Sequence, residues 1–265
     1  MTLDNCSTND AMVEKLLLRF DLGTLISNGK FFHMRCTAHI LNLVVRDGLK
    51  VIENGVGKIR ESVSYWTQTP KRFESFELAA RQLKINCKKS LKLDFPTRWN
   101  STYAMLDVAL MYKSVFSRLQ QRESQYKSLP SDSEWDLAAT MVEHLKPFYM
   151  LTEMFSGTKY PTANLFFPLI CKMKMSINGW RTSDNLAIRI MADKMVDKFE
   201  KYWNEIHPML VVAVVLDLRY KMLLIDFYFP KIYGDTADEH IERAHKLCHD
   251  LVKEYEMKAM VLSDR

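Results

Sequence analysis

LKLDFPTRWNSTYAML, from Leu91 to Leu106, is the stretch that decides how the chain is built. It continues a basic segment and is interrupted by Pro96, a residue that breaks a helix when it lies in the interior. After this proline, residues 98–121 contain neither glycine nor proline. The stretch therefore predicts an exposed basic connection, CKKSLKLDFP, that leads into a long helix over residues 98–121.

Helix breakers are also scarce in the rest of the chain. The 265 residues include eight glycines and eight prolines against sixteen methionines, and 48% of the residues are hydrophobic. This composition favours a mainly α fold with one large core or two smaller ones. Apolar residues recur at helical spacing in a set of segments that predict helices, namely residues 12–20, 36–65, 71–83, 98–121, 134–155, 163–180, 185–203 and 236–257.

Two short apolar stretches, residues 1–3 and 31–35, are predicted to be neighbouring strands. Ser7 and Thr8 are candidates for the N-cap of the helix that follows the first strand. The run MLVVAVVLDL over residues 209–218 fits a buried strand and a core helix equally well. The tryptophans outside the opening stretch are expected to pack in the core, and they are Trp66, Trp135, Trp180 and Trp203.

Composition also limits the surroundings and the partners. Five cysteines without a CxxC pair indicate reduced thiols, and no apolar run approaches the roughly 18 residues of a membrane span. With no signal-peptide pattern at the N-terminus, we expect a protein that acts inside the cell, away from the membrane. A formal net charge of +5 permits binding to a polyanion without requiring it.

Three phrases in order carry a family resemblance: TLDNCSTND (residues 2–10), RCTAHILNL (residues 35–43) and the Leu91 to Leu106 stretch. With the later YPTANLFFP (160–168) and VVLDLRYK (214–221), they resemble the hAT superfamily of DNA transposases. The resemblance is to the form carried by plant Ac-like elements and by domesticated plant proteins with BED zinc fingers. It implies a partial RNase H-like α/β core over residues 1–35, followed by a large all-helical insertion region over residues 36–265.

The resemblance also assigns a role to Asp4, as the second of three acids that hold two divalent metals. Carboxylates that converge on Mg²⁺ or Mn²⁺ are the usual means of in-line phosphoryl displacement. Asp4 alternatively caps the helix that follows it. The family's first aspartate and third glutamate have no counterpart here, so Asp4 is expected to hold metal only if the missing acids are supplied. We therefore expect a catalytically incomplete chain that has no cofactor of its own.

Cys36 and His39 form a CxxH pair within RCTAHILNL. The resemblance places His39 near the scissile phosphate, as a second catalytic carry-over. Two alternatives remain open. A zinc site would need further ligands, and a buried cysteine beside a hydrogen-bonded histidine at a helix start needs none.

Arg98 and Trp99 resemble the family's RW pair, in which the tryptophan stacks on distorted bases and the arginine supports a phosphate. Stacking requires a ring that is accessible to solvent, and the alternative is a tryptophan that anchors its helix in the core. Arg35, Lys88 and Lys89 would complete the predicted DNA-binding surface. The lysines are also explained as a solvated loop.

These observations predict a truncated or domesticated hAT transposase-like protein that binds DNA in the nucleus without an intact catalytic triad. Homo- or hetero-oligomers with other transposase-like proteins are an expected form of assembly. Two other interpretations remain: an all-helical module that binds another polypeptide, and a transposon relic without function.

Overall fold

The structure is a computed structural model that describes residues 1–95, 97–157 and 163–263. The described residues form eleven α-helices and two short strands, so the prediction of a mainly α fold is confirmed. Pro96 of the opening stretch and Tyr160 to Thr162 of YPTANLFFP lie outside the described residues. No described helix combines the length and the apolar composition that crossing a bilayer requires.

The chain divides into two compact units. The first unit contains residues 1–44, 154–182 and 192–265, and the second unit contains residues 45–153 and 183–191. Three long helices therefore contribute residues to both units. Each unit is described by itself below.

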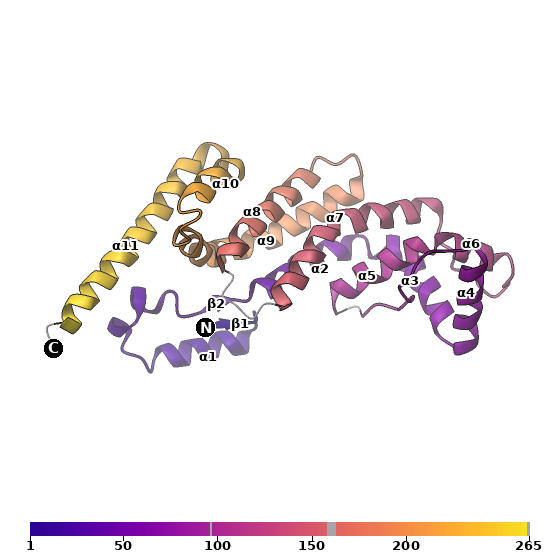
Figure 1. Cartoon of the computed structure of the whole chain (residues 1–265), viewed down its shortest axis with the longest axis horizontal. Helices are drawn as coiled ribbons and strands as arrows, with labels where there is room; N and C mark the ends of the chain where they lie inside the picture. The colour runs from indigo at the N-terminus through magenta and orange to yellow at the C-terminus, as the bar shows by residue number, and fades with distance from the viewer. Residues whose placement is uncertain (96, 158–162, 264–265) are drawn as a thin grey trace. The chain divides into compact units, whose positions relative to one another are not determined.

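The first unit begins with a pair of parallel strands, β1 (Thr2–Leu3) and β2 (Met34–Arg35), as predicted from their apolar residues (Figure 1). They are joined by α1 (Ser7–Leu17) and two 3₁₀ turns, η1 (Leu22–Thr24) and η2 (Ile26–Gly29). The N-cap of α1 is Cys6, without a side-chain cap bond. The predicted caps Ser7 and Thr8 are therefore wrong, because both residues already lie in the first turn of α1.

The rest of the first unit is helical. Its elements are α8 (Ala163–Trp180), most of α9 (Leu186–Val215), α10 (Leu223–Tyr233), the 3₁₀ turn η3 (Gly234–Thr236) and α11 (Ala237–Ser263). The apolar run that fitted either a strand or a helix lies in the last turns of α9 and just beyond it, so the helical alternative holds. Helix α11 is tied to η2 by Glu254, whose carboxylate accepts the Ser27 backbone N–H at 2.8 Å.

The second unit is a helical bundle in which the predicted long segments are divided. Residues 36–65 form α2 (Thr37–Val51) and α3 (Glu53–Thr67), and α4 (Pro70–Gln82) follows. The predicted helix over residues 98–121 is two helices, α5 (Trp99–Met111) and α6 (Lys113–Gln120), before α7 (Asp132–Gly157). The break is at Tyr112, whose backbone leaves the helical region and whose hydroxyl donates to the Lys89 carbonyl at 3.0 Å.

Aromatic side chains form the core of the second unit. The Trp66 ring meets Tyr126 edge to face, with ring centres 5.3 Å apart, and Phe76 packs on Phe116 at 5.1 Å. The predicted core positions of Trp66 and Trp135 in this unit and of Trp203 in the first unit are confirmed, since each is at most 2% exposed. Trp180 is only half-buried at the end of α8. The helices of the second unit thus pack on one another through aromatic side chains. The connection before α5 is joined to this packed core.

Candidate functional site

The strand pair of the first unit brings both predicted catalytic residues together. In the parallel register Leu3 lies opposite Arg35, so Asp4 and Cys36 leave the strands at the same edge. His39 is on the first turn of α2, and its Nδ1 is 3.9 Å from Asp4 Oδ1. This distance permits an ion pair when the imidazole is protonated. The Asp4 side chain is 66% exposed.

Asp4 does not cap α1 with its side chain. Its backbone carbonyl accepts hydrogen bonds from the Asn9 side-chain amide at 2.8 Å and from the Cys6 N–H at 3.0 Å. The carboxylate is left to face His39 and Cys36. Burial raises the pKa of the Cys36 thiol, and the negative charge of Asp4 raises it further. The thiol is thus held in its protonated form.

A two-metal centre does not fit the residues that the structure describes. Divalent hard cations require several carboxylate oxygens, and among the described residues no group of three or more His, Cys, Asp or Glu side chains is placed to hold a metal ion. Asp4 as a ligand of Mg²⁺ or Mn²⁺ therefore stays a prediction, conditional on acids supplied from elsewhere.

Arg35 is engaged by polar neighbours in the first unit. Its Nη1 is 3.2 Å from Asp10 Oδ1 and 3.4 Å from Asn5 Oδ1. The guanidinium therefore holds the start of α1 against β2. A contact between Arg35 and DNA stays a prediction, and it would have to compete with Asp10.

The connection before α5 is held to the rest of the second unit by the buried carboxylate of Asp94. Asp94 Oδ1 and Oδ2 accept from Arg60 Nε and Nη2, both at 2.9 Å, and Oδ2 also accepts from the Thr102 hydroxyl at 2.7 Å. Burial by itself would raise the pKa of Asp94, but the hydrogen bonds from Arg60 and Thr102 and the charge of Arg60 outweigh it and lower the pKa. The connection is thus pinned to α3 and α5 by a charged group.

The lysines of the connection differ in their surroundings. Lys89 Nζ forms a 2.7 Å ion pair with Asp107 Oδ2 on α5, and this hydrogen-bonded pair raises the pKa of Lys89. Lys88 and Lys92 are exposed, as is Arg98. Lys89 is therefore partly committed to the fold, whereas the other three extend into solvent.

Trp99 is the first residue of α5 and is buried, with 2% of its surface exposed. Its ring meets Tyr149 of α7 edge to face, with centres 6.5 Å apart, and Tyr149 stacks on Tyr103 at 4.5 Å. This geometry agrees with the alternative given above, in which the tryptophan anchors its helix in the core. The condition for base stacking, a ring accessible to solvent, is not met in this conformation, so stacking by Trp99 stays a prediction that requires the helix start to open.

Phe95 was missed from the sequence and is 68% exposed in the same connection. Its backbone is locked by Ser101, whose hydroxyl accepts the Phe95 N–H at 2.8 Å. The available signal was an aromatic residue directly before the proline of a basic loop. The aromatic ring that is exposed near Arg98 is thus that of Phe95 and not that of Trp99.

The two later phrases of the resemblance meet in the first unit. Asn164 of YPTANLFFP donates its side-chain amide to Asp217 of VVLDLRYK at 2.7 Å. Arg219 donates to the same carboxylate at 2.7 and 3.0 Å, and these hydrogen bonds lower the pKa of Asp217. The phrases therefore form one structural contact that fixes the turn after α9.

Comparison with known proteins gives the class of protein that has these features. The ZBED1 RNase-like helical domain model matches residues 34–144, and the model for hAT-like transposase, RNase-H fold, matches residues 164–255. The chain combines a helical domain with an RNase-H-type domain of transposases. The boundary predicted at residue 35 stays a prediction.

Three relatives extend the match. The putative AC transposase of Zea mays is 39% identical over 96% of this chain and 32% of its own length, and RICESLEEPER 2, a zinc finger BED domain-containing protein of Oryza sativa subsp. japonica, is 35% identical over 99% and 37%. DAYSLEEPER of Arabidopsis thaliana, another BED zinc finger protein, is 34% identical over 69% and 26%. The chain belongs to the hAT transposase family, and it spans about a third of the length of these curated relatives.

Proposed function

We propose that this chain is a DNA-binding part of a hAT transposase-like protein and that it acts in the nucleus, binding DNA without cleaving it unaided. The observation that carries the proposal is the connection before α5. Its backbone is fixed by the Asp94 ion pair and by Tyr112, while Lys88, Lys92 and Arg98 extend into solvent. A rigid loop with exposed cations is suited to the DNA backbone, because its side chains reach phosphates without ordering the main chain.

One further feature supports the same surface. The exposed ring of Phe95 can stack on an unpaired base, an interaction that tolerates any sequence. The small cleft of about 260 Å³ beside Trp99 adds little, because its cations Lys50 and Arg60 are paired with Asp47 and Asp94 and its wall also contains Glu53.

Cleavage is a separate part of the proposal. Asp4 supplies one carboxylate at the strand edge, and His39 supplies a neighbouring proton donor or acceptor. Phosphoryl transfer by two metals requires additional acids to hold the ions. The proposal is therefore that Asp4 and His39 contribute to catalysis only in a larger assembly.

The test is fluorescence anisotropy of a labelled DNA hairpin with the 265-residue chain over a salt series. Each lost phosphate contact in a duplex lowers the slope of log affinity against log salt by about 0.9. Lys88→Gln, Lys92→Gln and Arg98→Gln combined should lower it by about 2.7. Lys146→Gln, which replaces an exposed lysine of α7, is the control and should leave it unchanged. Equal slopes for the triple variant and the wild type would refute the loop as the DNA surface.

A second candidate function, binding to another polypeptide, is supported by exposed apolar side chains in the first unit. Leu223 and Phe227 on α10 are 67% and 53% exposed, and Tyr255 and Met260 on α11 are 60% and 65% exposed. Exposed groups of this size on neighbouring helices are typical of interfaces. Light scattering over a concentration series tests this role. A dimer that dissociates in the Leu223→Ser, Phe227→Ser double variant would favour it.

A further inference from the structure

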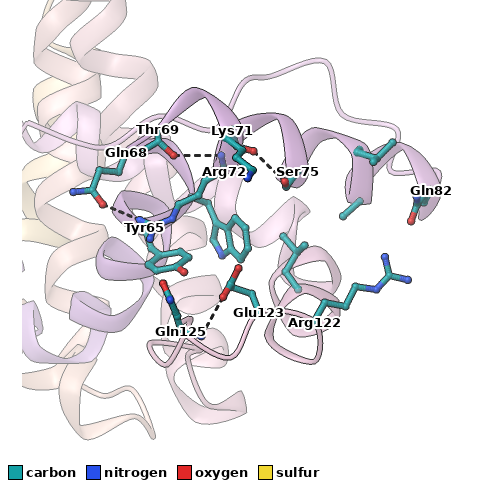
Figure 2. A pocket seen from close by; sticks show the side chains of 14 residues that line it. Tyr65, Gln68, Thr69, Lys71, Arg72, Ser75, Gln82, Arg122, Glu123 and Gln125 are labelled. Carbon is teal, nitrogen blue, oxygen red and sulfur yellow. Dashed lines mark hydrogen bonds between the residues drawn. The ribbon is translucent and has the colours of Figure 1, made fainter.

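The second unit contains a groove that is separate in its residues from the connection before α5. It lies between the end of α3, the length of α4, and the end of α6 with the segment that follows it, and its volume is about 970 Å³ (Figure 2). Most of its lining is polar or charged. The polar and charged lining residues are Tyr65, Gln68, Thr69, Lys71, Arg72, Ser75, Gln82, Arg122, Glu123 and Gln125.

A planar stacking surface forms one end of this groove. The guanidinium of Arg72 lies over the ring of Tyr65, with its central carbon 3.9 Å from the ring centre. Arg72 Nη1 also donates to Gln68 Oε1 at 2.9 Å, and this hydrogen bond holds the guanidinium over the Tyr65 ring (Figure 2). At the start of α4, the Thr69 hydroxyl accepts the Arg72 N–H at 3.3 Å. The stack is therefore positioned by both the helix start and a side-chain bond before any ligand binds.

Two further cations come from opposite walls of the groove. Lys71 belongs to the first turn of α4, and Arg122 follows α6 (Figure 2). Both are exposed. Glu123 is the acidic residue among the lining residues, and its Oε1 accepts the Gln125 N–H at 3.2 Å. Three cations against one carboxylate give the groove a positive charge.

We propose that this groove binds an unpaired nucleic-acid strand. A base would stack on the Arg72 guanidinium, which Tyr65 supports from its other side, with phosphates at Lys71 and Arg122. The side-chain amides of the groove can both donate to and accept from base edges. An acidic peptide would use the cations but not the stacking surface, and its carboxylates would meet Glu123. The inference shares its class of ligand with the proposed function, but it rests on different residues and on single strands.

The test measures binding of a fluorescein-labelled thymidine dodecamer to the full chain by anisotropy over a salt series. Arg72→Lys keeps the charge but removes the planar group, and it should weaken binding about tenfold through lost stacking. Lys71→Gln with Arg122→Gln should lower the salt slope by about 1.4, at about 0.7 for each single-strand phosphate contact. The matched control, Lys146→Gln with Arg81→Gln, changes exposed cations outside the groove and should leave both quantities unchanged.

The outcomes separate this inference from the proposed function. If the groove variants bind the dodecamer like the wild type while the loop variants lose the hairpin, the groove is not a strand site and the proposed function stands. If the groove variants lose the dodecamer while the loop variants keep the hairpin, the groove inference stands alone. A polyglutamate peptide that displaces the dodecamer from wild type, and whose own binding is unaffected by Arg72→Lys, would instead make the groove an acidic-peptide site.

Discussion

The connection before α5 and the β1–β2 strand pair each contain a carboxylate that belongs to the family resemblance, but the two carboxylates are held in opposite ways. The Asp94 side chain is fully buried and accepts three hydrogen bonds from Arg60 and Thr102. The Asp4 side chain is 66% exposed, and its ion-pair partner His39 is 3.9 Å away.

This difference separates a structural acid from one that is available to a ligand. A buried carboxylate with all its partners in place stabilises the fold and cannot bind anything else without losing them. An exposed carboxylate with one distant partner contributes little to stability and keeps its lone pairs for a cation. The comparison predicts large effects on stability in the first region and small ones in the second.

The largest expected effect is that of Trp99→Ala. Removing a buried tryptophan side chain leaves a cavity and should lower the free energy of unfolding by about 3–5 kcal/mol, because Trp99 packs against Tyr149. Urea denaturation followed by circular dichroism measures the change. Trp99→Phe, which keeps an aromatic ring, should cost less. A cost below about 1 kcal/mol for Trp99→Ala would show that the ring leaves the core easily and would restore it as a base-stacking residue.

Asp94→Ala should have the next largest effect. Removing one partner of a buried ion pair leaves the other uncompensated, which typically costs 3–5 kcal/mol. We expect about 3 kcal/mol, the lower end, because the Arg60 side chain remains 27% exposed and can be hydrated. Lys89→Gln breaks the exposed pair with Asp107 and is the matched control, with an expected cost below about 1 kcal/mol. Equal costs for the two variants would contradict the assignment of Asp94 as the anchor.

The contribution of Asp94 should also depend on pH. Its pKa in the folded chain is lower than its ordinary value of 3.8. Its stabilising effect is therefore complete above that value and is lost as the pH falls through the lowered pKa. The difference in unfolding free energy between wild type and Asp94→Asn should be constant near neutral pH and should shrink toward strong acid. A difference that grows on acidification would show the opposite sign of the pKa shift.

Much of the fold was predictable because helical periodicity is a local property of the sequence. The helix predicted over residues 163–180 matches α8, and the one over residues 71–83 differs from α4 by one residue at each end. Helix α10 was not predicted. Its sequence LLIDFYFPKIY is apolar on most sides and contains Pro230, so it shows no clear helical stripe.

The site was less predictable because its decisive contacts join distant parts of the chain. The sequence assigned no role to Asp94, since its partner Arg60 lies 34 residues earlier. The burial of Trp99 depends on Tyr149 of α7. A tryptophan at a helix start looks the same in sequence whether a later helix covers it or not. The meeting of Asp4 with His39 was implied by the resemblance and required the parallel register of two very short strands.

The smallest expected effect on stability is that of Asp4→Asn. An exposed side chain with one weak partner should change the free energy of unfolding by less than about 0.5 kcal/mol. The chemical effect should be clear nonetheless, because the Asp4 charge helps to raise the pKa of the Cys36 thiol. Removing that charge should lower this pKa and increase the thiolate fraction. Alkylation of Cys36 by iodoacetamide at pH 8 should then be a few times faster, short of the tenfold of a full pKa unit.

Peptide mass spectrometry resolves Cys36 from the four other cysteines of the chain, and Glu14→Gln, which removes an exposed carboxylate on α1, is the matched control. Its alkylation rate at Cys36 should equal that of the wild type. If Asp4→Asn leaves the rate unchanged, Asp4 and Cys36 do not share one edge of the strand pair in solution. If it costs several kcal/mol of stability, Asp4 is a structural acid like Asp94, and its availability to a metal in a larger transposase assembly would lose its physical basis.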